Sequence, residues 1–273
     1  MTRHDQPGAG VTVGIPFFSA TLADQFRLSV DSILCQTLQP DVVHLIQDGP
    51  VSDDVSALAE GYCASHPNVE RIVIPAWRGL PYALNVSILR TWTPYYARMD
   101  ADDISHPDRL RRQVSFLEEH PHTDILGTWV MEFAQDPFRE QGFLKRLPTE
   151  PGQIEAFFHY RNPLAHPSVM FRRSVFARIG LYDCEFATDQ DLALWARALK
   201  MRVGIANLPE VLLFHRAAAL ANKRSGIRRV YRQARARFSY NTWSPTLNLL
   251  KVSALLFRLL PEPVRVWGYR RLR

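Results

Sequence analysis

Short apolar runs alternate with helical segments in the N-terminal part of the chain, and this alternation limits the folds that the chain can adopt. Four apolar runs have the length of buried strands, and three helical segments separate them: the runs cover residues 11–15, 42–46, 69–74 and 95–99, and the helical segments cover 26–36, 53–64 and 81–90. Strands separated by helices form parallel sheets with helices on both faces. The pattern therefore predicts an α/β fold with a mainly parallel central sheet.

The regular alternation ends after this region. Further elements are predicted as a helix over 109–120, strands over 125–133 and 168–171, and a helix from Thr188 to about Lys200. Because no repeat or linker interrupts the chain before about residue 220, we expect one domain over residues 11–220. We expect residues 1–10 to be disordered and residues 221–273 to form a basic, amphipathic helical extension.

The positive charge of the chain is concentrated in its C-terminal tail. The net charge is +6, but residues 223–273 contain 13 lysine and arginine residues against one acid, so residues 1–222 carry a net charge of −6. The apolar stretch 247–260 is too short to span a bilayer. The tail fits an interfacial helix on an anionic membrane, with a plain packed extension as the alternative. It contains no nucleic-acid-reading module, so no nucleic acid is expected as a partner.

Several common functional classes lack their motifs in this chain. A phosphate-binding P-loop, a glycine-rich dinucleotide loop after the first strand, H-E-x-x-H and G-x-S-x-G are all absent from the sequence. The three cysteines lack the C-x-x-C spacing of a zinc site. The N-terminal residues are polar and do not resemble a signal peptide, so we expect a cytoplasmic location, with the tail holding the protein on the inner face of the cytoplasmic membrane.

An acidic cluster, Asp100-Ala101-Asp102-Asp103, directly follows the fourth predicted strand. Three carboxylates at this spacing repel one another unless a cation holds them together, and a hard divalent ion bound with a phosphate-bearing substrate would do so. The alternative is that Asp103 or Ser105 caps a helix that begins near Pro107.

Two other polar or aromatic segments also follow predicted strands. Pro16-Phe17-Phe18 comes after the first strand and Asp48-Gly49 after the second. Ligands of parallel α/β sheets bind beyond the carboxyl ends of the strands. The fold would therefore bring these two segments and the acidic cluster to one edge of the sheet.

Five segments in series resemble glycosyltransferase family 2, whose members have the GT-A fold and transfer sugars from nucleotide sugars with inversion. The resemblance covers residues 11 to about 200 and is carried by 11–18, 29–37, 46–49, 98–103 with 107–110, and 188–195. It implies a Rossmann-like nucleotide-sugar-binding half at 11–104 and an acceptor half at 105–220.

The resemblance also implies a metal site. In this family the second aspartate of a D-x-D motif holds Mn²⁺ or Mg²⁺ against the diphosphate of the donor. That aspartate corresponds to Asp102, and Asp100 would contact the ribose or the metal. A cation suits this position because the diphosphate accumulates negative charge as the glycosidic bond breaks.

The donor nucleotide would be bound by the other strand-end segments. Asp48 corresponds to the family's aspartate that accepts a hydrogen bond from uracil or thymine, although Gln47 replaces the acidic neighbour found in many relatives. Phe17 and Phe18 stand where the family often has a Tyr-Asn pair, so stacking on the base is retained but the polar contact of the asparagine is lost, and Pro16 before them would line the same site. Arg78 would reach the diphosphate.

Inverting transfer needs a base that takes the proton of the acceptor hydroxyl. The family's base corresponds to Asp189, with Thr188 in place of its usual acidic neighbour and Asp191 as the second candidate. Taken locally, Thr188 and Asp189 could instead only cap the helix. Asn162 and His166 lie where the family's acceptor loop is found, although a lone histidine is more often structural.

These features predict a metal-dependent inverting glycosyltransferase that moves a sugar from a UDP- or dTDP-sugar to a hydroxyl of a surface glycan or a lipid-linked acceptor. One alternative is a sugar-phosphate nucleotidyltransferase, which should have a glycine-rich, basic loop after the first strand. Pro16-Phe17-Phe18 has neither feature. The other alternative is a non-catalytic module that binds glycan or membrane.

Overall fold

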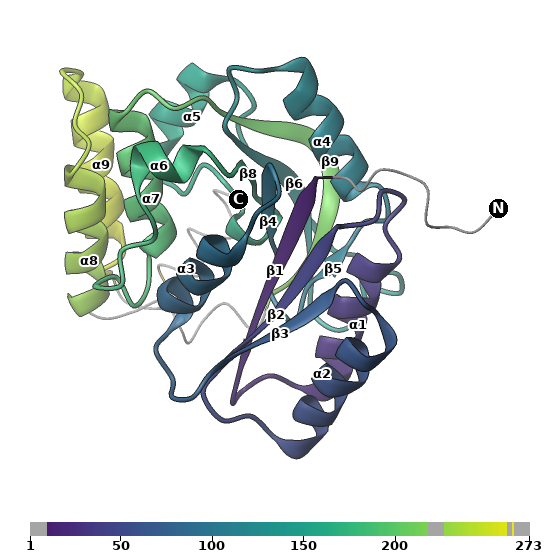
Figure 1. Cartoon of the computed structure of the whole chain (residues 1–273). Helices are drawn as coiled ribbons and strands as arrows, with labels where there is room; N and C mark the ends of the chain where they lie inside the picture. The colour runs from purple at the N-terminus through teal and green to yellow at the C-terminus, as the bar shows by residue number, and fades with distance from the viewer. Residues whose placement is uncertain (1–9, 218–226, 261–263, 265–273) are drawn as a thin grey trace.

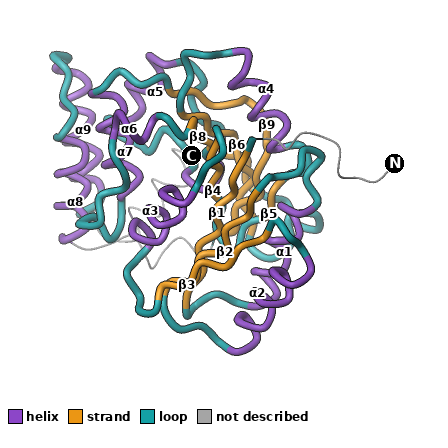
Figure 2. The backbone as a smooth tube through the Cα atoms, viewed as in Figure 1, coloured by secondary structure: helices purple, strands orange, loops and turns teal. Residues whose placement is uncertain are grey.

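The computed structural model describes residues 10–217, 227–260 and 264 (Figure 1). The predicted disordered N-terminus therefore lies outside the described residues except for Gly10. Figure 2 shows the helices and strands of the described residues by colour. The strands are β1 (Val11–Phe18), β2 (Val42–Asp48), β3 (Val69–Ile74), β4 (Tyr95–Arg98), β5 (Ile104–Ser105), β6 (Ile125–Phe133), β7 (Phe143–Lys145), β8 (Met170–Arg172) and β9 (Ile205–Arg216). The helices are α1 (Ala23–Leu34), α2 (Asp53–Ser65), α3 (Leu80–Arg90), α4 (Arg109–Glu119), α5 (Pro151–Phe158), the 3₁₀ turn η1 (His166–Ser168), α6 (Val175–Ile179), α7 (Gln190–Lys200), α8 (Ile227–Phe238) and α9 (Pro245–Phe257).

The strands form one sheet in the order β3-β2-β1-β4-β8-β6-β9-β5, with β7 paired to β6. The four strands β3, β2, β1 and β4 are parallel, as the alternating pattern predicts. β8 runs antiparallel to β4 and β6, and β5 runs antiparallel to β9. The predicted α/β fold is confirmed, but its second half is a mixed sheet because the chain there no longer alternates strand with helix.

β1 is longer than the sequence predicts. It continues through Pro16 to Phe18 and pairs with β2 along this whole stretch. β4 pairs with β1 only as far as Gly14, so Pro16 lies where one side of β1 has no strand neighbour. A proline is tolerated there because no ladder hydrogen bond from its nitrogen is needed on that side.

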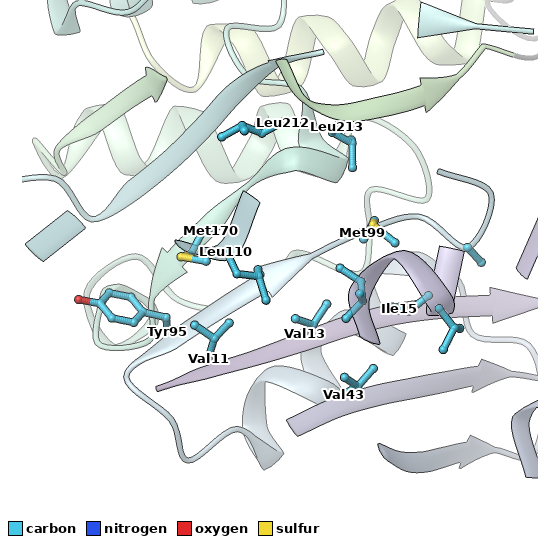
Figure 3. Close-up of a cluster of buried hydrophobic side chains, with 14 of the residues drawn as sticks. Val11, Val13, Ile15, Val43, Tyr95, Met99, Leu110, Met170, Leu212 and Leu213 are labelled. Atoms are coloured by element: carbon cyan, nitrogen blue, oxygen red, sulfur yellow. The ribbon is translucent and has the colours of Figure 1, made fainter. Parts of the chain in front are cut away.

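Helices cover both faces of the sheet. Alternate β1 residues Val11, Val13 and Ile15 are buried in one hydrophobic cluster together with residues of α1, α2 and α4 (Figure 3). α3, α6 and α7 contribute to a second cluster, in which Trp195 of α7 stacks on Phe171 of β8. The core therefore fixes the strand ends from both sides.

The order of the strands creates a topological switch point at the carboxyl ends of β1 and β4. The chain leaves β1 through α1 to reach β2 on one side, whereas β4 lies on the other side of β1. Such a switch point is where ligands bind in open α/β sheets. The segments after β1, β2 and β4 meet at this edge.

The described part of the tail forms a helical pair that packs on the domain beside α7 (Figure 1). Arg237 is buried and donates to the backbone carbonyls of Phe158 and Arg161. The buried Nζ of Lys251 in α9 donates to the carbonyl of Arg237 at 3.0 Å and to that of Tyr240 at 2.8 Å. Two of the tail's cations therefore satisfy backbone carbonyls at the C-terminal end of α8 and in the domain. Among residues 10–217 and 227–260, no helix combines the length and apolar character needed to cross a bilayer.

Replacing Lys251 by Met should destabilise the helical pair, because the side chain keeps its length but loses its three hydrogen bonds to Arg237, Tyr240 and Asn241. Burial lowers the pKa of Lys251 to about 8, so the ammonium is still mostly charged at pH 7. We expect the free energy of unfolding in urea at pH 7 to fall by about 2 kcal/mol. Val252→Met, at the exposed neighbouring position, should change it by less than about 0.5 kcal/mol. Equal stabilities of the two variants would contradict the role of Lys251 in binding the carbonyls at the C-terminal end of α8.

Candidate active site

The acidic cluster after β4 folds so that one carboxylate is fully buried. Asp103 lies 3.0 Å from His215 Nδ1 and accepts a hydrogen bond of 2.8 Å from the backbone N–H of Arg216. α4 begins only at Arg109, with Asp108 before it. The interpretation of Asp103 as a helix cap is therefore wrong, because its carboxylate joins the end of β9 to the cluster.

Asp100, Asp103 and His215 form a group that fits a divalent cation. Each offers one ligand atom, and these atoms all lie within 4.8 Å of one another. Two carboxylate oxygens and one imidazole nitrogen suit Mn²⁺, with the oxygen ligands also suited to Mg²⁺. The Asp102 side chain, which the resemblance assigns to the metal, is not part of this close group of described residues, although it is the next acid in the same turn.

The electrostatics of the cluster also favour a cation. Burial, then the charges of Asp100 and Asp103, raise the pKa of Asp102 to about 6. Burial also raises the pKa of Asp100, against the opposing charge of Arg98. Burial alone would lower the pKa of His215, but Asp103 and Asp100 outweigh it and the pKa is raised. The group as a whole therefore holds excess negative charge that a bound cation would neutralise.

Arg98 connects the acidic cluster to the second half of the site. Its guanidinium is buried, forms an ion pair with Asp100 and is among the charges that act on Asp191 and His166. Arg109 fixes this part of β4 by donating to the carbonyl of Arg98 at 2.7 Å. One buried cation thus lies between the predicted metal site and the predicted acceptor residues.

Asp48 lies at the end of β2 and organises the start of α3. Its two carboxylate oxygens accept hydrogen bonds of 2.7 Å from the backbone N–H groups of Arg78 and Gly79. Gly49 has φ +83°, and a Cβ there would lie 2.8 Å from the backbone nitrogen of Trp77. A side chain at position 49 would collide with Trp77, so this turn requires glycine there. Each carboxylate oxygen of Asp48 retains a lone pair for a further donor.

The two phenylalanines after Pro16 have different environments. Phe17 is fully buried and packs on Phe26 with ring centroids 4.8 Å apart, whereas Phe18 is 45% exposed. Only Phe18 is accessible for stacking on a base. Arg78 is exposed, and its guanidinium lies 4.6 Å from the ring centroid of Tyr82.

A cavity of about 780 Å³ lies beside α7 and contains most of the predicted acceptor residues. Asp189, Asp191 and Asn162 line it, together with residues of β7, α5, α8 and α9. Asn162 donates to the Asp191 carboxylate, and burial, with the nearby charge of Asp189, raises the pKa of Asp191. His166 is buried, and its Nε2 lies 2.8 Å from Tyr182 Oη. His166 therefore supports the loop from within rather than contacting an acceptor.

Asp189 precedes α7 in a left-handed backbone conformation, with φ 63° and ψ 21°. Its side chain makes no capping hydrogen bond to the helix, so the local interpretation of this side chain as a cap is wrong. One carboxylate oxygen accepts from Thr188 Oγ1 at 3.1 Å and the other from Gln233 Nε2 at 2.5 Å. A non-glycine residue in this conformation costs of order 1 kcal/mol, which the surrounding contacts must offset.

Comparison with known proteins identifies the family of the chain. The family model described as "Glycosyl transferase family 2" matches residues 12–180. The chain belongs to this family. It is 34% identical over 218 residues to the "Amylovoran biosynthesis glycosyltransferase AmsE" of Erwinia amylovora, covering 79% of each chain. It is 27% identical over 249 residues to the "UDP-Gal:alpha-D-GlcNAc-diphosphoundecaprenol beta-1,3-galactosyltransferase" of Escherichia coli, covering 89% of each chain.

Solved structures share the fold of this family 2 glycosyltransferase. S. aureus TarS 1–349 in complex with UDP-GlcNAc matches with a TM-score of 0.68 at 14% identity, over 91% of this chain and 72% of that chain. The mannosyltransferase PcManGT from Pyrobaculum calidifontis, in complex with GDP-Man and Mn²⁺, matches with a TM-score of 0.63 at 17% identity, over 95% and 74%. The predicted family, GT-A fold and enzyme class are confirmed, and a nucleotidyltransferase or a non-catalytic module is set aside.

The motifs did not identify two residues of the candidate site, His215 and Gln233. His215 is the second-last residue of β9, and the apolar run 211–214 before it is the kind of signal that marks a strand with polar residues at its end. Gln233 lies in α8, and no sequence pattern connects it to Asp189. Only the packing of α8 brings it there.

Asp102→Asn tests whether the ionised carboxylate of Asp102 destabilises the folded protein. The folded protein keeps the Asp102 proton up to about pH 6, whereas the ordinary value is 3.8, so the ionised carboxylate opposes folding at pH 7. Without metal at pH 7, the variant should melt at a higher temperature than the wild type, and the difference should vanish below pH 3.8. A lower melting temperature of the variant at pH 7, measured in chelator, would contradict this assignment.

Proposed function

We propose that the chain transfers a sugar from a UDP- or dTDP-sugar to a hydroxyl of a surface-glycan or lipid-linked acceptor, with inversion and with a divalent metal. The proposal rests on one observation: a group of side chains suited to a metal ion lies next to a cavity that holds a candidate general base. A group suited to a divalent cation, Asp100, Asp103 and His215, adjoins a cavity that holds the carboxylate of Asp189. Arg98 and Lys145 link them, since Arg98 pairs with Asp100 and Lys145 lines the cavity and acts on His215.

The metal site fits Mn²⁺ or Mg²⁺. Asp100, Asp103 and His215 would hold the ion, with Asp102 beside them. When bound, the ion would supply positive charge for the diphosphate that leaves. In the structure, Asp100 forms an ion pair with Arg98. The related mannosyltransferase structure from Pyrobaculum calidifontis contains Mn²⁺, which supports a metal in this chain.

The donor would lie over the carboxyl ends of β1, β2 and β4. Phe18 is the accessible aromatic ring for stacking on the base, and Asp48 retains lone pairs for a donor on the base. Pro16, Phe17 and Arg78 shape the surrounding edge, and Asp100 would also reach the ribose. The TarS structure contains UDP-GlcNAc, and the name of the Escherichia coli relative includes UDP-Gal, so a uridine donor is favoured.

Asp189 would act as the general base. It takes the proton of the acceptor hydroxyl while the hydroxyl oxygen attacks the anomeric carbon from the face opposite the leaving diphosphate. Asp189 is only 9% exposed and lines the cavity. Asp191, whose pKa is raised and whose carboxylate accepts from Asn162, would bind the acceptor instead.

Asp189→Asn tests the base assignment. The amide has the same shape but cannot accept a proton, so we expect transfer to fall by about 100-fold or more with donor affinity unchanged. Turnover is measured by UDP release, and donor affinity by calorimetry with a UDP-sugar and Mn²⁺. Near-normal turnover would rule out Asp189 as the base.

The lining of the cavity contains more basic than acidic side chains. Lys145, Arg146, Arg161, Arg237 and Arg258 line it, against Glu132, Asp189 and Asp191. The name of the Escherichia coli relative specifies an acceptor sugar joined to undecaprenol through a diphosphate. An acceptor with a diphosphate between sugar and lipid would suit this basic excess, because guanidinium groups form charge-assisted hydrogen bonds with phosphate oxygens.

The outer face of α9 is suited to a membrane surface. Leu249, Val252 and Leu256 recur on one face of the helix and are 67%, 42% and 59% exposed, and Trp243 before it is fully exposed. Large exposed apolar patches of this kind mark interaction sites. The tail's excess of lysine and arginine matches an anionic lipid surface, and Arg258 places the same helix at the cavity. We therefore include docking on an anionic membrane, at the inner face of the cytoplasmic membrane, in the proposed function.

Leu249→Glu combined with Leu256→Glu tests the docking face. We expect wild-type protein to co-sediment with phosphatidylcholine vesicles that contain phosphatidylglycerol, and the double variant to bind at least about 10-fold more weakly. Leu89→Glu on α3, which is also exposed and apolar, is the matched control and should bind like the wild type. Equal binding of the double variant and the control would contradict docking through α9.

A further inference from the structure

A side chain of the C-terminal helical pair reaches the proposed catalytic base. Gln233 of α8 is 2% exposed, and its Nε2 lies 2.5 Å from Asp189 Oδ1, 44 residues away in sequence. The other carboxylate oxygen, Oδ2, accepts from Thr188 Oγ1. Gln233 thus contacts the oxygen that the neighbouring threonine does not.

This contact holds the carboxylate in one orientation. The amide N–H of Gln233 donates to Oδ1 and the hydroxyl of Thr188 donates to Oδ2, so donors from two different elements fix the plane of the carboxylate. A fixed plane helps to aim the carboxylate at the acceptor. The orientation matters here because Asp189 has a left-handed backbone before α7.

The helix that carries Gln233 is fixed to the domain by residues that follow Gln233 in the chain. Arg235 pairs with Glu185 at 2.6 Å, and its guanidinium lies 5.0 Å from the ring centroid of Phe186. Arg237 donates to the carbonyl of Phe158, and Lys251 connects the end of α8 to α9. The position of the Gln233 amide is therefore set by contacts that do not involve Asp189.

Gln233 is also a costly residue for packing alone. Its Oε1 is buried and has no hydrogen-bond partner among the described residues. Leaving a buried amide oxygen unsatisfied opposes folding, so an apolar side chain would pack in this place at lower cost. The donated bond to Asp189 is the interaction that offsets this cost.

We propose that Gln233 is the positioning residue of the catalytic base, so that the C-terminal extension completes the active site. This inference rests on the proposed function, in which Asp189 is the base. The helical pair is then part of the catalytic apparatus as well as the docking element. A change in the seating of α8 would alter the rate of transfer without touching the donor site.

Gln233→Met in the full-length protein tests the role in catalysis. Methionine has a similar length but cannot donate, so we expect kcat to fall by about 10- to 100-fold while the KM and calorimetric affinity for the donor stay within about twofold. The assay uses UDP-galactose, Mn²⁺ and an alkyl-diphosphate-linked N-acetylglucosamine. Tyr231→Met, at a position of the same helix that is 69% exposed, is the matched control and should retain wild-type kcat. A wild-type kcat for Gln233→Met, or an equal loss in the control, would overturn the positioning role.

A double-mutant cycle tests the contact without relying on activity. Asp189→Gly removes the carboxylate and suits the left-handed backbone. Gln233→Met should lower the melting temperature by about 3–6 °C when Asp189 is present and by much less when it is Gly. Equal shifts in both backgrounds would overturn the contact. If Asp189→Asn instead kept normal turnover while the cycle showed coupling, the base assignment would fail and the contact would stand.

Discussion

The parallel pairing of β1 with β4 is the constraint on which the rest of the site depends. β1 lies between β2 and β4, and the connections from its carboxyl end and toward β4 run on opposite faces of the sheet. These two strand ends are the switch point of the sheet, where ligands of open α/β folds bind. Phe18 ends β1 and the cluster that begins at Asp100 follows β4, so the strand order brings both to this edge of the sheet. The chemistry of the site is thus a consequence of strand order before any side chain is considered.

The acidic cluster shows how this fold accepts an energetic cost for a function. Asp100, Asp102 and Asp103 come within one turn, and burial raises the pKa of Asp102 to about 6. Arg98 and His215 offset part of the repulsion, one from β4 and one from β9. A cluster optimised for stability alone would replace one carboxylate by an amide. That it does not is consistent with a site whose charge is balanced by a ligand.

Local pattern predicted the first half of the fold and the strand-end motifs, because these depend on neighbours in sequence. The alternation of side chains between the two faces of β1 also accounts for the environments of its two phenylalanines. Val11, Val13 and Ile15 are buried, so Phe17 follows them into the core and Phe18 does not. Ending the predicted strand at Pro16 concealed this. His215 and Gln233 could not be found in the same way, since the pairing of β9 with β6 and the packing of α8 on α7 are tertiary facts.

The basic tail combines roles that its composition alone does not separate. Charge counting treats Arg237, Lys251 and Arg258 alike, yet the first two are buried against backbone carbonyls and the third lines the cavity. The apolar residues of α9 point the other way, away from buried Lys251 and Leu255 on the same helix. One face of the pair is therefore held to the domain by hydrogen bonds, and the opposite face is left apolar. Since α8 carries Gln233 and packs on both α7 and α9, this one helix lies between α9 and the carboxylate of Asp189.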